Sequence, residues 1–201
     1  KKRVAALSKV LRDNISISHS QCGLAEIQEA DYEEMKEIEE FIPLWREALS
    51  KKTRREDYEA VRQWLLREVV FISEGSEGLQ TLALQEGAEH PELFYDLVNI
   101  HIKAGDLKKG EEVCRLGIDT LNKPHHRAVM ADWLAEIASR DGDTKLSLDY
   151  RRNAWRLEPT QQRLVKWWSS KHGVLPDEQL IEEVALLREQ RDNRHVRLVC
   201  M

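Results

Sequence analysis

Apolar residues recur at helical spacing along most of the chain, between short stretches that are polar or contain glycine. Residues 3–13 and 24–40 carry apolar positions three and four apart. Residues 54–72 are the most apolar, with one stripe formed by Tyr58, Val61, Leu65, Val69 and Ile72. The pattern predicts an all-α chain whose helices are joined by short connections.

Two breaks in this pattern locate predicted helix ends. Pro43 restricts the backbone of the residue before it, so we expect the helix over 24–40 to end or kink there. Residues 73–78 combine serine, glutamate and glycine and are predicted to form a turn before a short helix over 79–86. We expect an N-terminal helical section over 1–53 and a larger helical domain over 54–201.

A pattern repeats at an offset of 37 residues in the C-terminal half. Gly105-Asp106 and Gly142-Asp143 each lie between two helical patterns, and a leucine precedes each glycine by eight residues. Glycine permits a tight turn, and small residues let two helices approach closely, so each stretch is predicted to be a helical hairpin. The small residues lie five and twelve positions after the glycines: Gly110 and Gly117 in the first stretch, Ser147 and Ala154 in the second.

This arrangement resembles the tetratricopeptide repeat, in two degenerate units over 90–122 and 127–159. The second unit also matches at Pro159, and the first at Phe94 and Leu97. The resemblance implies a right-handed α-solenoid of antiparallel helix hairpins. The sequence departs from the family pattern at three positions: Val98, Ala131 and Asn122.

Further helix pairs are predicted on both sides of these units. Residues 54–89, with their turn at 73–78, are a candidate preceding unit. A following pair is predicted over 160–192, with a turn at 173–176. Its apolar positions are Leu164, Val165 and Trp168 on the first helix, and Leu180, Ile181, Val184 and Leu187 on the second.

In proteins of this family the first helix of each unit lines a groove that holds an extended peptide or a partner helix. The resemblance therefore implies a partner-binding strip on each first helix: Tyr95, Asn99 and Lys103 on one, and Asp132, Glu136 and Arg140 on the other. Side chains four residues apart suit hydrogen bonding to a peptide backbone or carboxylate. On spacing alone, a solvated face with an internal Glu136–Arg140 pair fits equally well.

Composition narrows the class of protein without naming a partner. The 201 residues are 41% hydrophobic with a net charge of −5, which provides for a core and does not favour a general nucleic-acid binder. The longest apolar run, 69–72, is far short of the roughly 20 residues of a membrane span, so no membrane partner is expected.

Cys22, Cys114 and Cys200 are too widely spaced for a disulfide framework, which predicts reduced thiols in a cytoplasmic protein. Because Lys1 is not preceded by an initiator methionine, we interpret the chain as a piece of a larger protein.

Motifs of catalysis and metal binding are missing from the sequence. It holds no nucleophile elbow, P-loop, dinucleotide-binding fingerprint or H-E-x-x-H sequence, so neither enzyme activity nor a cofactor is expected. His19 with Cys22, and the pair His125-His126, have ligand-like spacing, but a zinc site needs about four converging ligands. The acidic stretch over 26–40 is interpreted as a solvated helix face.

A local excess of basic residues supplies an alternative binding surface, the basic patch: Arg151, Arg152, Arg156, Arg163, Lys166 and Lys171. The same stretch holds Trp155, Trp167 and Trp168, and cations beside aromatic rings are typical of a nucleic-acid surface. Adjacent tryptophans cannot share one helix face, however, so at least one or two of these rings are expected to pack in the core.

The sequence therefore predicts a non-catalytic helical scaffold that binds another protein or peptide. The alternative is a nucleic-acid-associated helical domain that uses the basic patch. A third interpretation assigns the acidic N-terminal helices to an autoinhibitory or dimerising contact.

Overall fold

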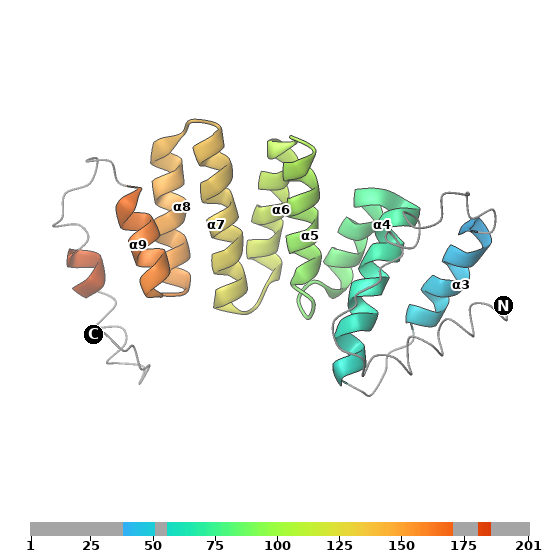
Figure 1. Ribbon diagram of the computed structural model, residues 1–201. Helices are drawn as coiled ribbons and strands as arrows, with labels where there is room; N and C mark the ends of the chain where they lie inside the picture. Colours follow the sequence, from blue (N-terminus) through green and yellow to red (C-terminus); the bar gives the residue numbers. More distant parts are fainter. Residues whose placement is uncertain (1–37, 51–55, 171–180, 186–201) are drawn as a thin grey trace. The chain divides into compact units, whose positions relative to one another are not determined.

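The computed structural model describes residues 38–50, 56–170 and 181–185 (Figure 1). All regular secondary structure in these ranges is helical, which confirms the predicted all-α class for this part of the chain. Within the same ranges no helix combines the length and the apolar character that crossing a membrane requires. The chain divides into two compact units between Gln85 and Glu86. The predicted boundary at 53/54 and the helices predicted over 3–13 and 24–37 lie outside the described residues.

The first unit contains α3, Ile38–Ser50, and most of α4, Glu56–Glu86. Arg62 is buried between these helices, where its guanidinium donates to the carbonyl of Leu49 and pairs with Glu59. The stripe predicted over 54–72 supplies Leu65 and Val69 to the core of this unit. The buried members of that core are Trp45, Leu49, Leu65, Leu66, Val69 and Val70.

The predicted break at Pro43 is wrong, because α3 runs through this residue. Proline removes one backbone hydrogen bond from a helix and crowds the preceding turn. Here the rings of Phe41 and Trp45, on either side of the proline, stack with their centroids 5.9 Å apart, and Trp45 is buried in the core. Packing of the apolar face therefore outweighs the local cost of the proline.

The turn predicted over 73–78 is reduced to one residue in the structure. Gly75 has φ 65° and ψ −156°, a combination that only glycine adopts without strain, and the residues on both sides of it are helical. The glycine therefore breaks α4 as expected, but the break is much shorter than the six-residue stretch that the composition indicated.

The second unit contains five helices and a short helical segment in its described residues. Extensive contacts join each helix to the next one along the chain, from α5 through α9, as Figure 1 shows in green through orange. Residues 181–185 are also helical. The helices are α5, Glu92–Lys103; α6, Leu107–Thr120; α7, Pro124–Arg140; α8, Thr144–Leu157; and α9, Gln161–Ser169.

The two glycine turns of the second unit are built alike, as the sequence predicts. Gly105 and Gly142 have φ of 77° and 81°, in the left-handed region that favours glycine. The aspartate after each glycine donates its amide to the carbonyl five residues earlier, at 2.9 Å in both turns, which is the closing bond of a Schellman motif. The side chains of Asp106 and Asp143 then accept the amide three residues on, at 3.1 and 2.9 Å, and cap the following helices.

The large and small positions of the repeat are also equivalent in burial. Leu97 and Leu134, eight residues before the glycines, are both buried. At Gly117 an added Cβ would lie 2.8 Å from the sulfur of Met130, so the Met130 side chain of α7 packs directly on this glycine of α6. The two units differ in the role of the proline near their ends. Pro159 follows the end of α8, whereas Pro124 is the first residue of α7.

Two of the predicted packing positions at the C-terminal end, Leu164 and Val184, do contact the apolar core, but α9 buries a different tryptophan from the one expected. Trp167 is buried in α9, and its ring stacks on that of Trp155 with centroids 5.5 Å apart. Val165 and Trp168, both predicted to be apolar packing positions, are about half exposed at 52% and 53%. Ile181 is exposed as well. The stacking of two large indole rings decides which face of α9 is buried. The spacing of the apolar residues alone does not distinguish this face from the neighbouring one.

Candidate functional site

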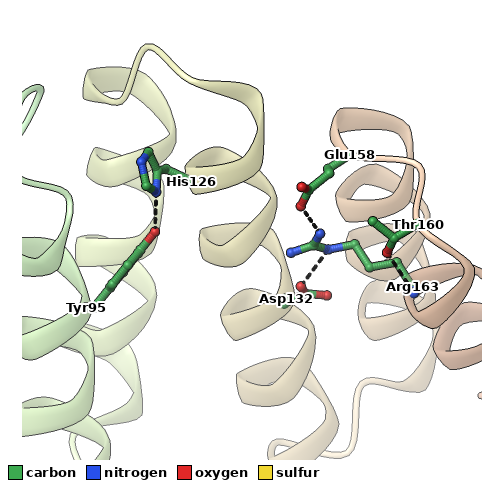
Figure 2. Close-up of polar contacts among 6 residues, drawn as sticks. All are labelled: Tyr95, His126, Asp132, Glu158, Thr160 and Arg163. Carbon is green, nitrogen blue, oxygen red and sulfur yellow. Dashed lines mark hydrogen bonds and ion pairs between the residues drawn. The ribbon is translucent and has the colours of Figure 1, made fainter. Parts of the chain in front are cut away.

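The predicted partner-binding strips lie on α5 and α7, and a hydrogen bond made by Tyr95 of the first strip joins these two helices. The hydroxyl of Tyr95 lies 2.6 Å from Nδ1 of His126, which is in the first turns of α7 (Figure 2). Further along α5, Asn99 is half-buried and Lys103 is exposed. One member of the α5 strip therefore contacts α7 directly.

Burial sets the protonation of the Tyr95–His126 pair. Burial, followed by the charge of neighbouring His125, lowers the pKa of the His126 imidazole below its ordinary value. Burial, followed by the Glu92 carboxylate, raises the pKa of Tyr95 to about 12. At neutral pH the imidazole is therefore uncharged and the phenol is protonated, so the two side chains share a neutral hydrogen bond whose donor is set by the imidazole tautomer.

A second polar bridge connects α7 with α9. Nε of Arg163 donates to Oδ2 of Asp132 at 2.8 Å, and the same guanidinium pairs with Glu158 in the α8–α9 connection. Thr160 caps α9 by accepting the backbone amide of Arg163 at 3.3 Å. Figure 2 shows the guanidinium held between the two carboxylates. Arg163 is mostly buried, so these charge-assisted bonds fix the start of α9 against α7 and α8.

The two bridges occupy equivalent positions in the 37-residue sequence pattern. Tyr95 and Asp132 are 37 residues apart in the sequence, and so are their partners His126 and Arg163. The chemistry differs, since one bridge is a neutral hydrogen bond and the other an ion pair. The geometry is the same, because in each case a residue on one first helix reaches the early turns of the next first helix. The same offset that relates the turns thus also relates the contacts between hairpins.

The remaining strip residues on α7 form weaker ion pairs. Glu136 lies 3.7 Å from Arg140 on the same helix and 3.9 Å from Arg151 on α8, measured between nitrogen and oxygen atoms. The internal Glu136–Arg140 pair that the spacing allowed is therefore present. Both of its side chains are about half exposed, so the pair adds little to stability and both groups stay accessible to solvent.

The basic patch is largely neutralised by acids from elsewhere in the chain. Arg163 pairs with Asp132 and Glu158, as described above, and Arg152 and Arg156 both pair with Glu183. Lys166 is exposed on α9, and Lys171 lies outside the described residues.

The sequence identified only the nearby Glu158 as an acid in this stretch. It gave no signal for Glu183, whose pairs with Arg152 and Arg156 span 31 and 27 residues. His126, which the sequence analysis weighed only as a metal ligand, was missed as the partner of Tyr95. The 37-residue offset between the two bridges is a signal that could have linked these positions in advance.

The tryptophans of the basic patch divide as expected between core and surface. Trp155 and Trp167 are buried, which confirms that at least one or two rings pack, and Trp168 is exposed. A single exposed ring is a small platform for stacking bases.

Neither a metal-binding cluster nor a reactive thiol is present in the described residues. Those residues hold no group of three or more His, Cys, Asp or Glu side chains that is arranged for a metal ion. Burial raises the pKa of the Cys114 thiol to about 12, so this thiol is protonated and unreactive at neutral pH.

The surface formed by α5, α7 and α9 is therefore the best-defined candidate site. It combines two bridges between hairpins with accessible amide, amine and charged side chains. Comparisons with protein-family models, curated proteins and solved structures found no match for this chain.

Proposed function

We propose that this chain is a non-catalytic helical-repeat scaffold that binds an extended segment of another protein. In this proposal the hairpins α5–α6 and α7–α8, followed by α9, form a solenoid that resembles tetratricopeptide repeats. The binding surface, called here the first-helix face, consists of the exposed side chains of α5, α7 and α9. The repeated bridge between first helices, Tyr95–His126 and then Asp132–Arg163, is the observation that carries the proposal.

The repeated bridge supports this function because it aligns successive first helices in one register. Residues at equivalent positions then form rows that continue from one helix to the next. Asn99 and Lys103 on α5, with Glu136 and Arg140 on α7, offer hydrogen-bond donors and acceptors along such a row. An extended peptide has backbone groups at regular intervals that such a row of polar side chains can pair with.

The proposal predicts that loss of half-buried Asn99 and exposed Lys103 on α5 weakens peptide binding. Peptides would be selected on the purified chain from a displayed library of short sequences, and their dissociation constants measured by fluorescence anisotropy. Changing Asn99→Ala together with Lys103→Ala should weaken binding about tenfold or more, equivalent to roughly 1.4 kcal/mol. The matched control changes Asn153→Ala with Lys108→Ala, which are exposed on the second helices α8 and α6.

Two outcomes would contradict the proposal. One is that no peptide is enriched by the folded chain. The other is that the selected peptides bind the first-helix variant and the matched control equally well, because the binding surface would then lie elsewhere.

The alternative, a nucleic-acid-associated domain, has fewer free groups to act with. Arg152, Arg156 and Arg163 already bind carboxylates, which leaves Lys166 and Trp168 as exposed members on α9. Titration of a labelled single-stranded oligonucleotide at low and high salt tests this alternative. Binding that falls steeply with salt and is lost in Lys166→Glu with Trp168→Ala would favour it over the peptide scaffold.

A further inference from the structure

Residues 181–185 are held on α8 and α9 by two neighbouring side chains. Glu183 is 3% exposed, and both of its carboxylate oxygens are bound by arginines of α8. Nε of Arg156 donates to Oε2 at 2.8 Å, and terminal nitrogens of Arg152 and Arg156 bind Oε1. Val184 packs on the apolar cluster that contains Trp155 and Trp167. The segment is therefore attached through one acid and one branched aliphatic residue.

The surface that receives Glu183 favours an anion. Arg152 and Arg156 are four residues apart on α8, so their guanidinium groups lie on the same face and repel each other. Burial, followed by the charge of Arg152, lowers the pKa of Arg156. A carboxylate that binds both groups removes this repulsion and accepts charge-assisted hydrogen bonds. Without such an occupant the arginine pair would be left close together and uncompensated.

The contact is also open to competition. The side chains of Arg152 and Arg156 remain 40% and 47% exposed, so an incoming carboxylate can reach them from solvent. Ile181, Glu182 and Ala185 are exposed and add no buried surface to the contact. Because residues 171–180 tether the segment to α9, its high effective concentration keeps it bound despite the small contact.

We infer that Arg152, Trp155, Arg156 and Trp167 form a second docking site, the acid-aliphatic site, for a peptide segment of another protein. The segment it takes carries an acidic residue followed by a branched aliphatic residue. Glu183 and Val184 occupy this site within the chain until such a segment displaces them. The inference does not depend on the proposed function, because the acid-aliphatic site is built on α8 and the buried face of α9.

Displacement can be measured on the full chain with a labelled peptide that has the sequence of residues 179–187. Glu183→Ala with Val184→Ala gives an opened variant, in which the site has lost its own occupant. Fluorescence anisotropy should show the peptide binding the opened variant at least about tenfold more tightly than the wild-type chain, since the internal competitor is removed. A peptide carrying Glu183→Gln and Val184→Ala should lose this binding.

Variants of the site separate recognition from nonspecific attraction. Adding Arg152→Glu and Arg156→Glu to the opened variant should abolish binding, and a peptide with Glu183→Arg should restore it. The matched control adds Lys108→Glu and Lys145→Glu, which make the same change in net charge at exposed positions of α6 and α8 and should leave binding intact. Circular dichroism checks that each variant is folded. If the opened variant does not fold, Glu183→Gln alone replaces it in the same titrations.

Three results would overturn the inference. In the first, the folded opened variant binds the peptide no better than wild type does, so that residues 181–185 are only a structural cap. In the second, the charge-matched control loses binding as completely as the site variant. In the third, sedimentation shows that wild-type chains exchange their own segments in a dimer that added peptide does not dissociate. The occupant would then be a second copy of this chain.

Discussion

Arg163 lies 31 residues from Asp132 in the sequence and 2.8 Å from it in the structure. The sequence places Arg163 among bases and tryptophans, which favours a surface for phosphates. The fold instead buries the guanidinium between two carboxylates, where it holds α9 in place. At the residue scale, the role of a charged side chain is therefore set by partners from other helices and not by its neighbours in the sequence.

The His126 imidazole should make stability depend on pH. Because the folded state lowers the pKa of His126, the unfolded chain binds more protons at mildly acidic pH. Stability should therefore fall as the pH decreases below about 6.5, the ordinary value for histidine. Urea unfolding at several pH values would show a smaller loss on acidification in His126→Gln than in the wild-type chain. Equal slopes for the two chains would mean that His126 does not contribute.

Leu134 should be one of the costliest side chains to truncate. It is buried in α7, one repeat after the equally buried Leu97, so Leu134→Ala should reduce the free energy of unfolding by about 2–5 kcal/mol. Leu146→Ala is the control, because this leucine on α8 is exposed and should cost less than about 1 kcal/mol. Chemical denaturation measures both. A loss below half of one kcal/mol for Leu134→Ala, on the order of a surface substitution, would contradict its core position.

At the element scale, helix ends are decided by a few local groups. The turns at Gly105 and Gly142 share the same sign of φ, the same five-residue backbone bond and the same aspartate cap. Helix interiors are decided differently. The helix α3 continues through Pro43 because Trp45 and Leu49, which follow the proline on the same helix, are buried against α4.

Substitution of Gly142 should be costly for backbone reasons alone. Its φ of 81° is strained for a residue with a side chain, yet an added Cβ would meet no atom within 4 Å. Gly142→Ala should therefore destabilise the chain by about 1–2 kcal/mol, whereas Gly142→Asn should cost less, because asparagine tolerates the left-handed region. Thermal and urea denaturation would test this order. If alanine were as stable as glycine, or asparagine as costly as alanine, the strain argument would fail.

At the scale of the second unit, the extensive contacts among its described helices, α5 to α9, join helices that follow one another along the chain. In such an arrangement a local change is felt mainly by its neighbours, as in a one-dimensional array. The described contacts at the C-terminal end centre on Trp155 and Trp167, with Leu148, Leu164 and Val184 around them.

This arrangement predicts that a defect at one end unfolds only that end. Trp167→Ala removes a buried ring that contacts Trp155, so α8, α9 and residues 181–185 should open more often. Hydrogen exchange should show faster exchange in these segments and an unchanged rate in α5 and α6. Uniformly faster exchange from α5 to α9 would show that the unit opens as one cooperative body.

The residues of the candidate site were predictable in part. The resemblance to tetratricopeptide repeats implied the strip of Tyr95, Asn99 and Lys103, and their counterparts in the second strip lie 37 residues further on. The offset also relates the bridging partners His126 and Arg163, but nothing local in the sequence states that these side chains touch. Glu183 was beyond prediction, since its pairing depends on how the chain returns to α8 after residues 171–180.

The sequence by itself determined the helical class, the two glycine turns, and the packing of at least one tryptophan of the 151–171 stretch in the core. These features follow from forces that act within a few residues, such as backbone strain and helical periodicity. Only the tertiary structure decided which face of α9 is buried, that α3 continues through Pro43, and which carboxylate each arginine binds. Those outcomes depend on contacts between helices far apart in the chain, where burial and ion pairing outweigh local preference.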